Sequence, residues 1–266
     1  MRGDYIHGYT EAESLRLSNQ AQTLADLLHY DTVFPPGSSV LEAGCGTGAQ
    51  TVFLAKRNPE AHITAIDISP DSLKKAEARM EREGMTNVVF QEGDVYHLPF
   101  DNACFDHVFV CFLLEHLDRP VDAVFNLKKL LNPGGTLTVI EGDHGSAFFY
   151  PHSEAAQKAI ACQIELQARS GGNALIGREL YPLFKRAGFR DIKVSPRMVY
   201  VDASRPEFVE GFTKKTFTSM IEGVRERAVT AGIIDPEVFD SGIRNLYRTA
   251  EDDGVFCYTF FKALGR

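Results

Sequence analysis

The chain has 266 residues, of which 44% are hydrophobic and 24% are charged, and its formal net charge is -8. These proportions are typical of a soluble globular protein and exclude wholesale disorder. An acidic chain repels phosphate backbones unless it carries a local basic patch. No such patch is visible, and Lys128-Lys129 and Lys214-Lys215 are isolated pairs. The sequence therefore predicts that nucleic acid is not a partner.

The cysteines and the apolar runs indicate the compartment. The five cysteines are scattered and form no C-x-x-C pair, which is typical of a reducing compartment. The start of the chain shows no signal segment, and no apolar run approaches the roughly 20 residues that span a bilayer. No grouping of His, Asp, Glu or Cys has a spacing that demands a metal. We predict a cytoplasmic protein with no membrane partner.

The first half of the chain alternates between helices and strands. A helix is predicted over residues 10–30, and the Phe34-Pro35-Pro36-Gly37 segment then breaks the chain. The periodicity next predicts strands at 39–43, 61–66, 87–90, 105–111 and 136–140, with helices that include 69–83 and 120–131. Strands separated by helices imply right-handed crossovers and a parallel sheet covered on both faces.

The pattern changes after Glu141. It predicts helices at 153–168, 177–187, 206–231 and 236–250, an extended segment at 189–201 and a last strand at 254–263. We divide the chain into an N-terminal helical lid (1–37), a cofactor-binding α/β domain (38–203 and 252–266) and a helical insertion (204–251). The insertion is a cap or an oligomer surface, and we expect a monomer or a homodimer.

The most informative stretch follows the first strand, where Gly44, Gly46 and Gly48 stand at equal intervals after Glu42. Glycine is needed where the backbone takes a positive φ or lies directly against a ligand. Dinucleotide-binding loops have the wider spacing G-x-G-x-x-G, and a carboxylate beside the loop would repel a pyrophosphate. The same carboxylate accepts bonds from a cationic or neutral ligand. We interpret the loop as a ligand site rather than as a merely tight turn.

Two further acids follow the next two strands. Asp67 ends the second strand about 20 residues after the loop, where an acid bonds both ribose hydroxyls. A turn or helix-cap role before Ser69-Pro70 is the alternative for Asp67. Asp94 follows the third strand in a position to accept a bond from an adenine amino group. Three acids at three successive strand ends favour a nucleoside ligand.

Five motifs in this order resemble one known family, the class I S-adenosylmethionine-dependent methyltransferases. They are Glu42-x-Gly44-x-Gly46-x-Gly48, Asp67, Gly93-Asp94-Val95, Phe105-Asp106-x-Val108 and Leu131-Asn132-Pro133-Gly134-Gly135. The resemblance covers roughly residues 38 to 142 and is greatest to small-molecule enzymes typified by quinone C-methyltransferases. It implies a doubly wound α/β fold with a mostly parallel, Rossmann-like sheet of seven strands, the last of them antiparallel.

The resemblance also implies how S-adenosylmethionine is bound. The three glycines would cradle its methionine portion, Asp67 would hold the ribose and Asp94 the adenine. Four neighbouring residues would complete the site, with Ile68 and Val95 flanking the adenine ring and Cys111 and Phe112 touching the methionine portion.

The catalytic candidates are two histidines. Methyl transfer requires alignment and exclusion of water, and a general base helps when the nucleophile is a hydroxyl or an acidic carbon. His116 follows the fourth strand and His144 follows the fifth, and an imidazole titrates near neutral pH. The alternatives are that His116 packs a helix turn over the sheet edge and that His144 is a loop histidine.

The amino terminus is predicted to fold over the crevice as a lid. It carries Tyr5, His7, Gly8, Tyr9, Arg16 and Gln20. In this hypothesis Gln20 bonds the cofactor carboxylate and the tyrosines wall the substrate. An amphipathic helix packed on the sheet explains the leucines of this segment equally well.

We predict transfer of a methyl group from S-adenosylmethionine to a small-molecule acceptor by in-line displacement. One alternative is an NAD-type oxidoreductase on a similar sheet, and another is a non-catalytic S-adenosylmethionine-binding module. The sequence leaves the acceptor open, because this fold serves many nucleophiles.

Overall fold

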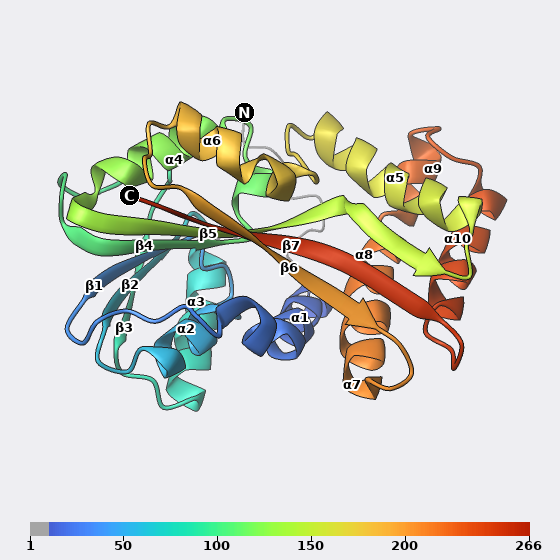
Figure 1. Ribbon diagram of the computed structural model, residues 1–266, viewed down its shortest axis with the longest axis horizontal. Coiled ribbons are helices and arrows are strands. Elements are labelled where there is room, and N and C mark those ends of the chain that lie inside the picture. The colour runs from blue at the N-terminus through green and yellow to red at the C-terminus, as the bar shows by residue number, and fades with distance from the viewer. Residues whose placement is uncertain (1–10) are drawn as a thin grey trace.

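The computed structural model describes residues 11–266 and is built around one seven-stranded sheet (Figure 1). The strand order is β3-β2-β1-β4-β5-β7-β6, and β7 is antiparallel to both of its neighbours. The strands are β1 (Ser39–Ala43), β2 (His62–Asp67), β3 (Val88–Glu92), β4 (Phe105–Cys111), β5 (Leu131–Tyr150), β6 (Lys193–Val201) and β7 (Val255–Gly265). This topology confirms the predicted fold class.

Helices cover both faces of the sheet. Figure 1 shows α4, α5 and α6 on one side and α1, α2 and α3 on the other. The helices before β6 are α1 (Glu11–His29), α2 (Thr51–Arg57), α3 (Pro70–Arg82), η1 (Leu114–His116), α4 (Pro120–Lys129), α5 (Glu154–Arg169), η2 (Ile176–Glu179) and α6 (Leu180–Arg186). Those between β6 and β7 are α7 (Pro206–Phe208), η3 (Val209–Thr218), α8 (Ser219–Glu222), α9 (Arg225–Thr230) and α10 (Pro236–Arg248).

Local sequence signals explain where several helices begin and end. The hydroxyl of Ser69 accepts a hydrogen bond from the backbone N–H of Ser72, and Pro70 occupies the first turn of α3. Gly84, just beyond the helix, has a φ of +66°. Ser69 and Pro70 therefore fix the start of α3 immediately after β2, and Gly84 marks its end.

The fifth strand is longer than predicted. We expected it to end near Ile140 and His144 to lie beyond it, but β5 continues to Tyr150 and contains His144. The reason is the antiparallel partner β7, which pairs with β5 from Leu137 to Tyr150 with a register shift after Asp143. The alternative that His144 is a loop histidine is therefore wrong.

The helical insertion is more broken than predicted. The single helix expected over 206–231 is divided into α7, η3, α8 and α9, and η3 is a π-helix. Within η3 the hydroxyl of Thr216 donates to the carbonyl of Gly211 at 2.6 Å. A Cβ at Gly211 would collide with Thr23 of α1, so this glycine lets η3 approach α1 closely. Close packing against α1 favours the irregular helix.

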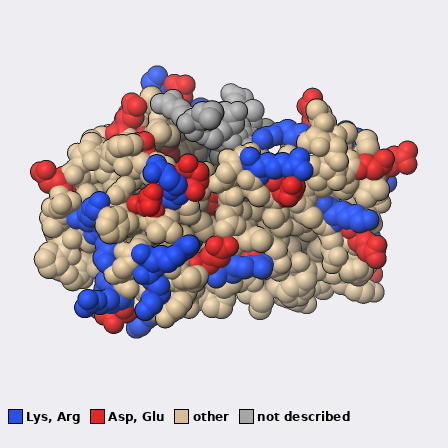
Figure 2. Space-filling view, turned by 90° about the horizontal axis from the view of Figure 1, so that it is seen from above, with Lys and Arg blue, Asp and Glu red and all other residues tan. Residues whose placement is uncertain are grey.

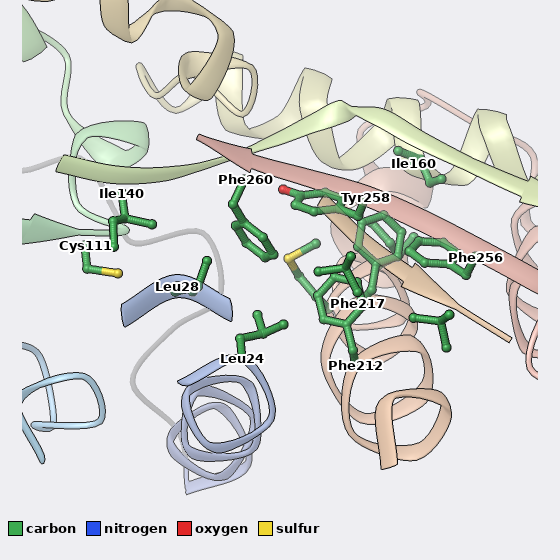
Figure 3. Packing of buried hydrophobic residues seen from close by; sticks show 14 of the residues in the cluster. Leu24, Leu28, Cys111, Ile140, Ile160, Phe212, Phe217, Phe256, Tyr258 and Phe260 are labelled. Atoms are coloured by element: carbon green, nitrogen blue, oxygen red, sulfur yellow. The ribbon is translucent and has the colours of Figure 1, made fainter. Parts of the chain in front are cut away.

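The largest buried cluster joins α1 and the insertion to the same face of the sheet (Figure 3). Leu24 and Leu28 of α1 are fully buried in this cluster. Aromatic rings from η3 and β7 fill the remaining space: Phe212, Phe217, Phe256, Tyr258 and Phe260. The carboxyl-terminal half of α1 is thus part of the core, as the amphipathic-helix alternative requires.

Charged side chains of both signs lie next to one another on the surface. Figure 2 shows Lys and Arg beside Asp and Glu over one face, and Lys56–Glu83 and Arg225–Asp240 are examples of ion pairs. Within residues 11–266, no helix combines the length and the apolar character that crossing a membrane requires. The cytoplasmic location stays a prediction.

Candidate functional site

The glycine loop between β1 and α2 has the backbone that only glycine adopts without strain. The φ angles of Gly44, Gly46 and Gly48 are +77°, +53° and +74°. A Cβ at Gly44 would lie 2.8 Å from the side chain of Leu113, and one at Gly48 would lie 3.0 Å from Ala76. Within the described residues, a Cβ at Gly46 would meet nothing within 4 Å. Two glycines therefore permit close packing of the loop, while Gly46 presents bare backbone to open space.

Asp67, the last residue of β2, holds this loop. One of its carboxylate oxygens accepts from the backbone N–H of Gly46 at 2.8 Å, and the other accepts from Ser69 at 2.9 Å. Asp67 therefore does cap the turn before α3, and it also supports the loop. Burial raises the pKa of Asp67, although these backbone hydrogen bonds oppose the shift. A carboxylate has about four acceptor positions, so three backbone donors leave room for a ligand.

Glu42 is a buried carboxyl group one residue before the end of β1. It is 2% exposed, and its Oε2 atom has no hydrogen-bond partner within the part of the chain that the structure describes. Burial raises the pKa of Glu42 to about 7, and the nearby Asp67 adds to this shift. A buried polar atom without a partner is costly. This oxygen lies beside the loop, where it could accept a hydrogen bond from a polar or cationic group of a ligand.

A separate hollow lies where β3 ends. It is lined by Ile68, Glu92, Gly93, Asp94, His97 and Pro99. The Asp94 carboxylate accepts from the backbone N–H of Tyr96 at 2.9 Å and lies 3.3 Å from Nδ1 of His97. Ile68 is 44% exposed at this hollow, whereas Val95 is buried in the core beside the sheet. Of the two residues predicted to flank the adenine ring, Ile68 lies in the hollow and Val95 packs in the core.

The end of β4 is a strained turn between the loop and a second pocket. Cys111 is buried, and Phe112 has a φ of +57°, which side chains other than glycine rarely adopt. The buried Glu141 of β5 stabilises this turn, since its Oε1 accepts from the backbone N–H groups of Leu113 at 3.0 Å and Leu114 at 2.6 Å. Burial raises the pKa of Glu141 well above its usual range. Strain of this kind is typical of functional sites.

The second pocket, which we call the acceptor pocket, lies beyond Phe112 and has a volume of about 50 Å³. Its polar lining is Arg16, Gln20, Glu115, His116 and His144. Its other lining residues are Leu17, Phe112, Gly142, Met220, Tyr258 and Phe260. Both predicted catalytic histidines and Gln20 therefore lie in one pocket, brought together from α1, η1 and β5.

Burial sets the charge of both histidines. It lowers the pKa of His116 and of His144, and the nearby Glu115 carboxylate opposes the shift in each case. Both imidazoles are consequently neutral near neutral pH, the form that accepts a proton. Nδ1 of His144 lies 2.7 Å from the hydroxyl oxygen of Tyr258, which fixes the plane of the ring.

The comparison with known families decides the assignment of the chain. A family model described as "Methyltransferase domain" matches residues 35–188, which is more than half of the sequence. The chain belongs to this methyltransferase family. The match confirms the predicted class I S-adenosylmethionine-dependent methyltransferase and its cofactor, and it removes the support for an NAD-type oxidoreductase.

Individual relatives agree with the family. An uncharacterized methyltransferase of Schizosaccharomyces pombe is 31% identical over 182 residues, which are 66% of this chain and 63% of that protein. The 27-O-demethylrifamycin SV methyltransferase of Amycolatopsis mediterranei is 27% identical over 227 residues, covering 84% of this chain and 76% of its own length. The chain thus spans less than two thirds of the yeast relative.

The fold matches solved methyltransferases as well. The Haemonchus contortus phosphoethanolamine N-methyltransferase 2, in complex with phosphomonomethylethanolamine and S-adenosylhomocysteine, superposes with a TM-score of 0.58 at 19% identity. The match covers 96% of this chain and 58% of that one. At this identity the likeness establishes the shared fold.

The structure describes only part of the predicted lid. Arg16 and Gln20 line the acceptor pocket, and Nη1 of Arg16 donates to Oε1 of Gln20 at 3.3 Å. Arg16 also forms a two-pronged ion pair with Glu13 at 2.6 and 2.7 Å. The predicted contributions of Tyr5, His7, Gly8 and Tyr9 lie outside the described residues.

Sequence reasoning missed several pocket residues. Glu115 stands beside the predicted base His116, and this adjacency was the available signal. Tyr258, Phe260 and Met220 come from β7 and α8, far along the chain, and no local pattern marks them. Within residues 11–266, no group of three or more His, Cys, Asp or Glu is arranged to hold a metal ion.

Proposed function

We propose that this methyltransferase transfers the methyl group of S-adenosylmethionine to a small molecule bound in the acceptor pocket, by in-line displacement. One observation carries the proposal: the glycine loop and the acceptor pocket meet at the end of β4. Leu113 packs against Gly44 of the loop, and its neighbour Phe112 lines the pocket. A donor held by the loop and an acceptor held in the pocket would therefore approach each other across Phe112.

On the donor side, we assign the methionine portion to the loop around Gly46, the ribose to Asp67 and the adenine to the hollow at Asp94. When bound, S-adenosylmethionine supplies an electrophilic methyl group on a sulfonium. The open space at Gly46 and the unpartnered oxygen of Glu42 support this assignment. We retain Cys111, Phe112 and Gln20 as contacts to the methionine portion, and Ile68 and Val95 as neighbours of the adenine.

On the acceptor side, the pocket combines a few convergent polar groups with apolar walls. The walls exclude water, and the polar groups orient the acceptor for attack. His144 and His116 are our candidates for the group that removes a proton from it. The name of the A. mediterranei relative places its methyl group on an oxygen of a small molecule, which favours the same acceptor class here.

We also propose that two segments outside the sheet shape the acceptor pocket. Residues 1–37 act as a lid, because Arg16, Leu17 and Gln20 of α1 line the pocket. Residues 204–251 act as a cap, because Met220 of α8 lines it too. Residues 38–203 and 252–266 form the cofactor-binding domain between them. A monomer or a homodimer fits this arrangement.

Binding and turnover test the proposal separately. Isothermal titration calorimetry should detect S-adenosylmethionine and S-adenosylhomocysteine, and NAD should not compete with them. Mass spectrometry should then detect S-adenosylhomocysteine when the protein is incubated with S-adenosylmethionine and pools of small aromatic hydroxy compounds. Binding without any product across such pools would favour a non-catalytic binding module, and failure to bind either nucleoside would refute the proposal.

A further inference from the structure

One carboxylate in the acceptor pocket has no part in the roles assigned so far. Glu115 of η1 is only 8% exposed, and its Oε1 lies 3.7 Å from Nε2 of His116. It lines the same pocket as His144. Desolvating a carboxylate is costly unless hydrogen bonds or opposite charges compensate. The contacts of Glu115 therefore indicate what its burial is for.

A ladder of buried amides on α5 holds Glu115 in place. Nε2 of Gln167 donates to the backbone carbonyl of Glu115 at 2.9 Å and lies 3.2 Å from its Oε2. Nε2 of Gln163, one turn earlier, donates to Oε1 of Gln167 at 3.1 Å. Both glutamines are almost completely buried. Since Gln163 binds the oxygen of the Gln167 amide, the nitrogen of that amide must face Glu115, and Oε1 of Glu115 is left toward His116.

The surrounding charges keep Glu115 ionised. Burial alone would raise the pKa of Glu115, but His116, His144, the Gln167 hydrogen bond and Arg16 together lower it. In return, Glu115 raises the pKa of both imidazoles against the effect of burial. Among the described residues, the other ionisable groups that face this cluster are Glu13 of α1, Glu141 and Asp143 of β5, and Tyr258 of β7. The pocket thus holds one carboxylate beside two neutral imidazoles.

We infer that Glu115 is a positioning residue that prepares the imidazoles of His116 and His144 to take a proton. The acceptor then belongs to a class that a base helps, a hydroxyl compound or an acidic carbon, and of these we infer a hydroxyl compound, the class that the A. mediterranei relative favours. The inference rests on the proposed methyl transfer. A thiolate or an unprotonated amine attacks without a base, so neither needs a buried carboxylate behind an imidazole. A hydroxyl group needs a base, because its oxygen still carries a proton at neutral pH.

The step balances as a base-assisted displacement. The oxygen–carbon bond to the methyl group forms while the carbon–sulfur bond breaks, and the electron pair of that bond stays on sulfur. The hydroxyl proton passes to an imidazole nitrogen. The imidazolium formed lies beside the carboxylate of Glu115, which stabilises it, and the proton later leaves to water.

The first test reads the imidazoles directly and needs no acceptor. Titration of the histidine ring nitrogens by ¹⁵N NMR should show the pKa of His116 and His144 lower in Glu115→Gln than in wild type, because an opposing negative charge is lost. Variants His116→Asn and His144→Asn assign the signals, and the exposed His62 and His152 serve as internal references. Unchanged titration of both pocket histidines would overturn the role of Glu115.

The second test compares S-adenosylhomocysteine formation with two small nucleophiles of nearly the same shape, phenol and thiophenol. With phenol, Glu115→Gln and Gln167→Met should lower kcat about tenfold to a hundredfold, less than the roughly 10²–10⁴-fold that the loss of the base itself costs. With the thiol, which ionises at neutral pH, kcat should change less than about twofold on the same reasoning.

A matched control variant shows whether the effect is specific to Glu115. Glu179→Gln removes a carboxylate that also accepts from an amide, that of Asn173 at 3.0 Å, outside the pocket, and it should leave kcat for both probes unchanged. Equal losses with both probes, or methylation of the thiol alone, would overturn the hydroxyl assignment. If neither probe is methylated, the NMR titration decides the role of Glu115, while calorimetry with S-adenosylmethionine decides the proposed function.

Discussion

The donor edge and the acceptor pocket of this methyltransferase are assembled in different ways. The donor edge consists of the ends of β1, β2 and β3, and its decisive contacts are made by backbone atoms and by acids that stand next to the strands. The acceptor pocket is lined by residues from position 16 to position 260, on α1, η1, β5, α8 and β7. The first is a local structure, and the second exists only in the folded chain.

The two regions therefore depend on different features of the chain. A loop that binds the donor depends on glycine spacing and strand order, which nearby residues set. A pocket built from distant side chains depends on how the insertion and the helices pack. If the two regions are independent, a change in one should leave the other intact, and a change where they join should affect both.

The largest effect is expected in the core behind the acceptor pocket. Phe256 of β7 is fully buried, and its ring centroid lies 4.7 Å from that of Phe217. Phe256→Ala should lower the free energy of unfolding by about 3–5 kcal/mol, because a cavity replaces the ring. Urea denaturation measures this loss. Val89→Ala, at an exposed site near the donor edge, is the control and should change stability by less than about 0.5 kcal/mol.

A single added side chain at the donor edge should reduce cofactor binding without unfolding the protein. Gly46→Val would fill the open space at the loop and weaken S-adenosylmethionine binding by at least about a hundredfold, or about 2.8 kcal/mol. Gly84→Val is the matched control, since Gly84 also has a positive φ and open space but follows α3. Calorimetry on both variants compares them. Wild-type affinity in Gly46→Val would contradict the assignment of the loop.

His29 joins the two regions and should make their stability depend on pH. It ends α1, is fully buried, and its Nε2 lies 2.8 Å from Oε1 of Gln50, which precedes α2. Burial lowers the pKa of His29 from 6.5 to about 4. Folding therefore favours the neutral ring. The stability that His29 contributes is complete when the pH is above its pKa in the unfolded chain. It is lost as the pH falls toward its pKa in the folded protein.

At about pH 5 the free energy of unfolding of the wild-type protein should therefore be about 2 kcal/mol lower than at neutral pH. His29→Gln does not titrate, so its unfolding free energy should fall less over the same range. Chemical denaturation at several pH values measures the two profiles. Parallel profiles would show that His29 does not couple protonation to folding.

The smallest effect concerns a contact between α1 and α3. Nη2 of Arg79 donates to the hydroxyl of Ser18 at 2.7 Å. Ser18→Ala should lower the unfolding free energy by about 1.5 kcal/mol, the low end for a hydrogen bond to a charged group. A much larger loss in thermal or chemical unfolding would mean that α1 is fixed to the donor edge more firmly than to the acceptor side.

The sequence predicted the donor side well because its signals are local. The strand β4, the start of α3 at Ser69-Pro70 and the order of the glycines and acids all depend on residues a few positions apart. The antiparallel last strand followed from the family resemblance rather than from any local pattern, and the structure confirms it.

The acceptor side was harder to predict because tertiary pairing overrides local periodicity. The extension of β5 through His144 depends on β7, more than a hundred residues later. The helix predicted over 206–231 is divided in the region where Gly211 approaches Thr23 of α1, a contact far along the chain. Tyr258 contacts His144 only because the same strands pair, so no neighbouring residue in the sequence predicts this contact.

A crystal structure of the protein with S-adenosylhomocysteine tests the central claim most directly. The account predicts that the nucleoside lies along the donor edge, with its ribose at Asp67, its adenine at Asp94, and its sulfur beside Gly46 and directed across Phe112 into the acceptor pocket. The nucleoside bound elsewhere, or a sulfur directed away from the pocket that holds His144, would contradict it.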